Sequence, residues 1–130
     1  MIDPDALRAI AEKINVLRDS LTESIKVLED KVNGFNLGLG AGVRFQDGQI
    51  YGYGLIGRRW CFYWQKNSKE SGIPLVEAPL DARADFIDKA HVVLKALCLE
   101  TVQITKEIRE ATKLANEFVE GIRSVQNGHD

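Results

Sequence analysis

The longest uninterrupted pattern in the sequence is a run of apolar residues at helical spacing within residues 81–126. Twelve positions follow one another at intervals of three or four, and all but Thr101 are apolar: Ile87, Ala90, Leu94, Leu97, Thr101, Ile104, Ile108, Ala111, Ala115, Phe118, Ile122 and Val125. This spacing predicts one amphipathic helix, with Asp81 as its N-cap. The helix would be about 69 Å long, whereas a compact chain of 130 residues has a diameter of about 36 Å. It must therefore bend, project, or pack on another chain.

A second helix is predicted over residues 3–33, which hold no glycine and only one proline. Asp3 suits the N-cap, Pro4 the first helical position, and Asp5 the positive end of the helix dipole. One face is apolar throughout: Leu7, Ile10, Ile14, Leu17, Leu21, Ile25, Leu28 and Val32. Gly34 is expected to close the helix in the left-handed conformation.

Residues 35–66 are expected to form an antiparallel meander of three strands. Eight of the 11 glycines lie between Gly34 and Gly57. Asp47-Gly48 is typical of a two-residue hairpin turn, which would pair Phe45 with Ile50 and Val43 with Gly52. A second turn at Gly57-Arg58 would pair Leu55 with Trp60, Tyr53 with Phe62, and Tyr51 with Trp64.

The predicted fold is therefore α+β in a single domain, residues 1–130. An N-terminal helix precedes a three-stranded, glycine- and aromatic-rich antiparallel sheet, a loop over residues 67–80, and the long C-terminal helix over residues 81–126. We expect the two helices to pair and to dimerise through a helical bundle. The predicted oligomer interface is Leu94, Leu97, Ile104, Ile108, Phe118 and Ile122.

The predicted hairpins give the sheet two different faces. Leu39, Val43, Phe45, Ile50 and Ile56 share one face, which is expected to be the core. The other face carries glycines and aromatic rings, and two interpretations of it stay open: a layer packed on the long helix, or a partly open surface that stacks on a flat ligand. The ligand-binding residues under the second interpretation are Arg44, Tyr51, Tyr53, Arg58, Arg59, Trp60 and Trp64.

Composition excludes several classes of protein. The chain has 17 basic and 19 acidic residues, a net charge of −2, and 45% hydrophobic residues, which argues against a disordered or fibrous chain. Residues 44–70 hold five basic and two acidic groups, a net of +3 that favours a small anion over a nucleic acid. We expect no membrane segment, no signal peptide and a cytoplasmic location.

Catalytic groupings are not recognisable. Asp88 and His91 lie one helical turn apart, but the sequence lacks the repeated Glu-x-x-His motifs of a di-metal bundle. Cys61 has no histidine near it in sequence, and Gly38-x-Gly40-x-Gly42 lies within a predicted strand, not between a strand and a helix. The predictions are no enzyme activity, no cofactor and no metal site.

The order helix, three strands, long helix is similar to that of the YbaB-type nucleoid-associated proteins, a resemblance that implies a tweezer-like dimer and DNA binding. The leading functional prediction is a non-enzymatic oligomeric binding or adaptor protein. Its long helices would self-associate, and its aromatic and basic sheet would recognise a partner protein. One alternative is binding of a small anionic aromatic ligand or nucleotide; a second is nucleoid-type DNA binding, which the net acidity disfavours.

Overall fold

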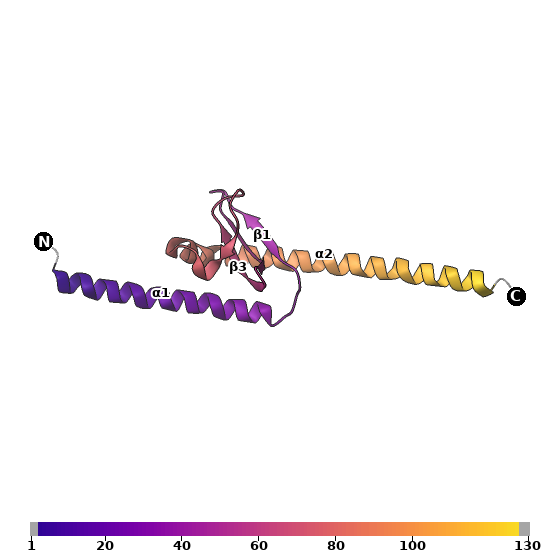
Figure 1. The fold of residues 1–130 in the computed structure, drawn as a ribbon, viewed down its shortest axis with the longest axis horizontal. Helices are drawn as coiled ribbons and strands as arrows, with labels where there is room; N and C mark the ends of the chain where they lie inside the picture. The colour runs from indigo at the N-terminus through magenta and orange to yellow at the C-terminus, as the bar shows by residue number, and fades with distance from the viewer. Residues whose placement is uncertain (1–2, 128–130) are drawn as a thin grey trace.

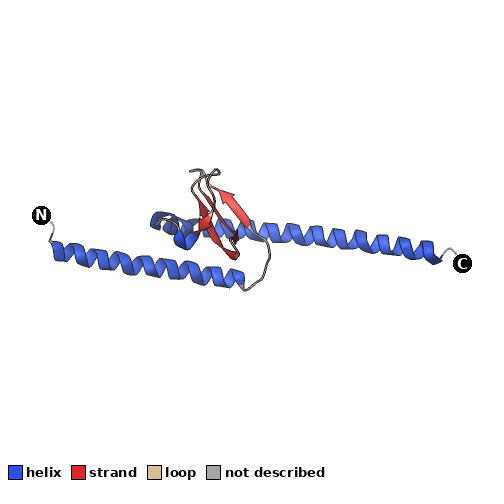
Figure 2. Cartoon of the chain, viewed as in Figure 1, coloured by secondary structure: helices blue, strands red, loops and turns tan. Residues whose placement is uncertain are grey.

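The chain folds into two long helices with a small antiparallel sheet between them in sequence (Figures 1 and 2). The computed structural model describes residues 3–127. Its elements are α1 (Pro4–Asn33), β1 (Ala41–Arg44), β2 (Ile50–Ile56), β3 (Arg59–Gln65), β4 (Ile73–Pro74), a 3₁₀ turn (Leu75–Glu77) and α2 (Leu80–Asn127). The predicted α+β order of helix, antiparallel sheet and long helix is confirmed.

Helix α1 starts as predicted and ends differently. The Asp3 carboxylate accepts a hydrogen bond from the backbone N–H of Asp5 at 3.1 Å, which caps the helix. Gly34, however, has φ −61° and donates its N–H to the Asp30 carbonyl, as a helical residue does. The prediction that Gly34 is left-handed is therefore wrong. Positive φ first occurs at Asn36 (51°) and again at Gly38 (67°), where the linker turns toward β1.

Helix α2 is 48 residues long, which corresponds to about 72 Å. It begins at Leu80, so Asp81 lies inside the first turn and not at the predicted cap position. There the Asp81 carboxylate accepts a hydrogen bond from the backbone N–H of Ala82 at 3.0 Å. The predicted length of the helix is confirmed, and it is continuous from end to end.

The sheet has four strands in the order β1-β2-β3-β4, one more than predicted. The additional strand lies in the segment predicted as a loop, where Ile73 pairs with Trp64 and Pro74 with Tyr63. The 3₁₀ turn that follows buries Leu75 almost completely. A strand of two residues that contains a proline carries no alternating pattern from which it could be predicted.

The two hairpins differ in how well the sequence predicted them. The β2–β3 register agrees with the prediction: Leu55 pairs with Trp60, Tyr53 with Phe62, and Tyr51 with Trp64. The β1–β2 register is one residue away from the prediction, because Val43 pairs with Tyr51 and not with Gly52. The turn is a three-residue loop, in which the Phe45 N–H bonds to the Gln49 carbonyl and Gly48 has φ 86°.

This slip changes which side chains share a face of the sheet. Tyr51, Tyr53 and Phe62 are at most 3% exposed and belong to one cluster with Phe86 of α2. Ile50 and Ile56 lie on the opposite face, so their assignment to the core face is wrong. The aromatic face is mainly the core layer against α2, as the first of the two interpretations predicted.

On the opposite face, the ring of Tyr63 lies across the glycines of β1 and β2. A Cβ atom added at Gly52 would lie 2.6 Å from the Ala41 carbonyl oxygen and would overlap the Tyr63 ring. A Cβ at Gly54 would lie 3.3 Å from Tyr63 Cε1. The glycines therefore allow the Tyr63 ring to cover the strands.

The helices run in the same direction but are offset along their length (Figure 1). Arg83, near the start of α2, donates a hydrogen bond from Nη1 to Thr22 Oγ1 in the middle of α1 at 2.7 Å. Helix α1 thus extends beyond the start of α2, and α2 extends far beyond the end of α1. Neither helix is apolar enough to cross a membrane over the described residues.

We expect Gly52→Ala to lower the free energy of unfolding by about 1–3 kcal/mol, because the added methyl group overlaps both the β1 backbone and the Tyr63 ring. Chemical denaturation would measure the change. Gly54→Ala is the matched control, with one close contact instead of two, and should cost less. Equal losses for the two variants would contradict this account of the glycine surface.

Candidate functional site

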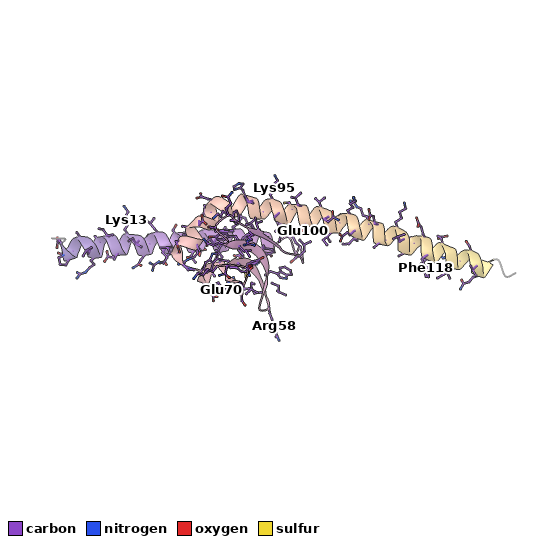
Figure 3. All side chains as sticks on the ribbon, turned by 90° about the horizontal axis from the view of Figure 1, so that it is seen from above. Lys13, Arg58, Glu70, Lys95, Glu100 and Phe118 are labelled. Carbon is purple, nitrogen blue, oxygen red and sulfur yellow. The ribbon has the colours of Figure 1, made fainter. Side chains whose placement is uncertain are left out.

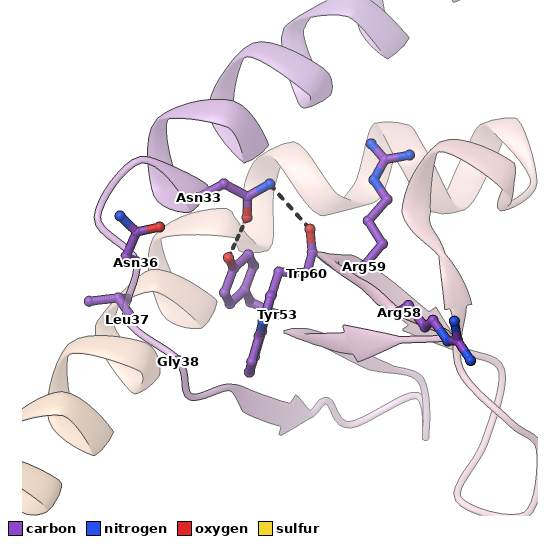
Figure 4. Close-up of a pocket in the computed structure, with 8 residues that line it drawn as sticks. All are labelled: Asn33, Asn36, Leu37, Gly38, Tyr53, Arg58, Arg59 and Trp60. Atoms are coloured by element: carbon purple, nitrogen blue, oxygen red, sulfur yellow. Dashed lines mark hydrogen bonds between the residues drawn. The ribbon is translucent and has the colours of Figure 1, made fainter.

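The predicted ligand-binding residues fall into three groups. Four of the seven line one cleft of about 450 Å³ at the end of the sheet: Tyr53, Arg58, Arg59 and Trp60 (Figure 4). Tyr51 is fully buried, Trp64 is half-buried, and Arg44 is exposed at the opposite end of the sheet. The structure thus brings together the residues around the β2–β3 turn and separates the other three from them.

The wall of the cleft opposite the β2–β3 turn comes from the end of α1 and the linker: Asn33, Asn36, Leu37 and Gly38. Asn33 holds Tyr53 and Trp60 in place on the other side of the cleft. Its amide oxygen accepts a hydrogen bond from the Tyr53 hydroxyl, and its amide nitrogen donates one to the Trp60 carbonyl at 3.2 Å. The Tyr53 and Trp60 rings stack with centroids 5.8 Å apart. The guanidinium groups of Arg58 and Arg59 lie at the rim and point away from each other (Figure 4).

Helix α1 also completes the edge of β3. Strand β4 pairs with β3 only at Tyr63 and Trp64, so on the side away from β2 the backbone at Trp60 and Phe62 has no neighbouring strand. Glu29 and Asn33, one helical turn apart, supply the missing partners: the Glu29 carboxylate accepts the Phe62 N–H, and Asn33 binds the Trp60 carbonyl. Two side chains of a helix therefore replace part of a strand.

Glu29 is an unusual residue in this position because its carboxyl group is only 2% exposed. Its oxygen lies 3.9 Å from Nη2 of Arg59, whose side chain is mostly in solvent. Burial raises the pKa of the Glu29 carboxyl, and this effect is larger than the lowering that Arg59 causes. The carboxylate is needed as a hydrogen-bond acceptor, but its charge is poorly compensated.

A polar cluster anchors the β1–β2 turn to α2 at the opposite end of the aromatic face. The Tyr51 hydroxyl lies 3.1 Å from both the Ala82 carbonyl and the Asp85 carboxylate. The Lys89 ammonium bonds to Asp85 and lies 3.6 Å from the Asp47 carboxylate. Burial, and then Asp85, raises the pKa of Tyr51, while a backbone N–H and Lys89 lower that of Asp47. Each charge has a partner, so the cluster is a structural clamp.

The groups weighed as catalytic candidates lie apart from one another. His91 is exposed on α2, and burial raises the pKa of the Cys61 thiol, which disfavours the reactive thiolate. His129 lies outside the described residues. Within residues 3–127, no three His, Cys, Asp or Glu side chains are grouped so as to hold a metal ion.

Most of the exposed large apolar side chains lie on the far ends of the two helices. Every residue from 4 to 20 is exposed, and so is every residue from 105 to 126; we call these segments the α1 overhang and the α2 overhang. Figure 3 shows both as single helices whose side chains reach into open space, Lys13 on one and Phe118 on the other. The apolar stripe continues through each and is 44–71% exposed at Leu7, Ile10, Ile14, Leu17, Ile108, Phe118, Ile122 and Val125.

Between the folded body and the α2 overhang lies an apolar groove of about 380 Å³. It is lined by Val32, Phe35, Leu37, Leu94, Leu97, Cys98, Thr101 and Val102. The groove is located beside α2 at the point where α1 ends and the linker begins. Phe35 is 74% exposed at its margin, and the Cys98 thiol is accessible.

The six predicted interface residues divide between body and overhang. Leu97 is buried in the core, and Leu94 is partly buried against it. Ile104 is half-buried at the root of the overhang, whereas Ile108, Phe118 and Ile122 are open. Sequence reasoning missed Phe35 and Leu37, although two apolar residues directly after a helix end are a recognisable signal. It also missed Glu29 and Asn33, whose partners are backbone atoms without a sequence signature.

Comparison with known proteins adds no assignment. No protein-family model matches the chain, and neither the curated proteins nor the solved structures contain a match. The function must therefore be argued from the surfaces described above.

Replacing Glu29 should separate its charge from its role as an acceptor. Glu29→Ala leaves the buried Phe62 N–H without a partner and should lower the free energy of unfolding by about 1–3 kcal/mol. Glu29→Gln keeps an acceptor and removes the buried charge, so at pH 7–8 it should be at least as stable as the wild type.

The dependence on pH gives the check. Because the folded state binds the Glu29 proton more tightly than the unfolded chain does, this residue favours folding at low pH. That contribution is lost as the pH rises from the ordinary value through the raised pKa. Denaturation at several pH values should therefore show that Glu29→Gln has the higher free energy of unfolding at neutral pH. Its difference from the wild type should shrink as the pH falls through this window. An advantage that grows on acidification would contradict the assignment.

Proposed function

We propose that this chain is a non-enzymatic, self-associating binding or adaptor protein whose helix overhangs form the assembly interface. The observation that carries the proposal is the pair of open apolar stripes on helices that extend away from the body in opposite directions. Eight large apolar side chains on these stripes are 44–71% exposed. Contiguous apolar surfaces of this kind mark interaction sites in folded proteins.

The stability of the overhangs supports the same proposal. Most helical stability in proteins comes from packing of an apolar face against other elements and not from helix propensity. Residues 4–20 and 105–126 have no such packing within the chain. A partner helix packed on each stripe would supply this stabilising contact. A second copy of the chain is always available as such a partner.

The recognition surface in this proposal is smaller than the sequence led us to expect. Most of the aromatic face packs on α2, so only the end of the sheet remains open. There, Trp60 is half-buried beside the exposed side chains of Arg58 and Arg59. As an adaptor, the protein would contact its partner protein through this region and through the outer faces of the assembled helices.

Light scattering across a wide concentration range tests self-association. The expected mass is that of a dimer or a higher oligomer, and a monomer at all concentrations would overturn the proposal. Phe118→Glu should weaken association by roughly 10-fold or more, because loss of a buried aromatic anchor costs about 2 kcal/mol or more. Asn116→Glu adds the same charge on the other side of the helix and should have little effect. Circular dichroism would verify that both variants remain helical.

A second candidate function is binding of a small anionic aromatic ligand, such as a nucleotide, in the cleft. The observation in its favour is that Tyr53, Arg58, Arg59 and Trp60 line one cavity of a size suited to a ligand. A base could stack on the indole of Trp60, and the exposed Arg58 guanidinium group could bind a phosphate.

For this candidate, Arg58→Ala and Trp60→Ala should each reduce binding of a fluorescent mononucleotide by about 10-fold or more without changing the oligomeric mass. Titration followed by fluorescence anisotropy measures the loss. Arg44→Ala is the control, since it removes an exposed arginine from the opposite end of the sheet, outside the cleft. Normal binding by both cleft variants would exclude this site.

A further inference from the structure

The two overhangs are similar in length and carry the same kind of surface. The α1 overhang has 17 residues and the α2 overhang has 22, which correspond to about 26 Å and 33 Å. Each carries one apolar stripe, and each stripe continues the face by which the same helix packs in the body. Leu21 and Ile25 extend the α1 stripe into the core, and Leu94 and Leu97 do so for α2.

We propose that the α1 overhang of one copy packs antiparallel on the α2 overhang of a second copy, and that the second copy does the same in return. This inference rests on the proposed self-association and names the surfaces that form it. Within a chain, α1 and α2 point in the same direction. A two-fold axis perpendicular to both helices turns the second copy around, so that its helices point the opposite way. The axis thereby places the partner's α1 beside this chain's α2 with opposite polarity.

The groove at the root of the α2 overhang supports this occupant. Val32 at the end of α1 and Leu97 of α2 both line the groove, which continues along α2 to Thr101 and Val102. Because Leu94 and Leu97 pack in the body, the surface left open there continues the packing face of α2. The α1 overhang of a second copy, arriving from the other side, would cover this continuation.

Exchange also covers more surface than pairing of like helices. An α2–α2 pair would leave both α1 overhangs open, whereas the reciprocal arrangement covers all four stripes in one closed dimer. The eight exposed stripe residues of each chain would all be covered in this dimer, whereas an α2–α2 pair would cover only the four on α2.

Charge does not oppose the pairing. The α1 overhang holds three basic and three acidic residues, and the α2 overhang holds four of each. Both segments are therefore electrically neutral, and two copies can approach through them without net repulsion. In addition, the charged residues are interspersed along both helices, so that ion pairs can form at the margins of the stripes.

Chemical cross-linking distinguishes the possible pairings. In a Cys98→Ser background, Cys61 is the remaining thiol and is buried. One series of variants carries Ile10→Cys together with a second cysteine at Ala111, Phe118 or Val125; others carry a single cysteine. Short bis-maleimides should convert at least one double variant into a covalent dimer with high yield. Within a chain, the start of α1 and the end of α2 lie at opposite ends of the molecule, so cysteines on the two overhangs cannot be linked there (Figure 1).

The controls separate this inference from the proposed function. The single variants should give at least fivefold less covalent dimer than the best double variant. Glu12→Cys, on the other side of α1, should give little when it replaces Ile10→Cys. Efficient cross-linking of the single Ile10→Cys or Phe118→Cys variant would show pairing of like helices and overturn the exchange. A light-scattering mass of a dimer with no cross-linked double variant would overturn it as well, with self-association still standing. A monomeric mass would overturn both proposals.

Discussion

The packing of the aromatic sheet face on the first turns of α2 is the interaction on which the rest of the molecule depends. Phe86 lies at its centre, with ring centroids 5.0 Å from Phe62 and 6.0 Å from Tyr51. These large rings supply most of the buried apolar surface that a small sheet can offer. Because the sheet packs on α2, the edge strand β3 lies next to α1, and side chains of α1 can bind its free backbone groups.

This arrangement uses only a minor part of each long helix. The body engages α2 through residues as far as Leu97 and engages α1 from Leu21 onward. Beyond these contacts, residues 4–20 and 105–126 are helical and exposed throughout. The molecule therefore combines a folded body with two preformed, unpartnered helices, and the proposed functions divide in the same way: the helices for assembly, the cleft for recognition.

Sequence reasoning was most reliable where one pattern extended over many residues. The stripes of both helices predicted their lengths, and the Gly57-Arg58 turn predicted the β2–β3 register. It was less reliable where a single residue decides the geometry. The three-residue loop ending at Gly48 moved the β1 register by one, and with it Ile50 and Ile56 changed faces. Part of the cleft was predictable because Arg58, Arg59 and Trp60 are adjacent in sequence. The contribution of Asn33 was not, because it depends on how α1 folds back onto the sheet.

The use of Glu29 and Asn33 to complete the β3 edge has a consequence for the behaviour of the protein in concentrated solution. As long as α1 is docked, the backbone groups of Phe62 and Trp60 are occupied and cannot accept a foreign strand. If α1 detaches, an aromatic strand with an unpaired edge is exposed, and such edges are templates for aggregation. The seating of α1 is thus also a safeguard against amyloid-like polymerisation, and conditions that weaken it should be those under which the protein precipitates.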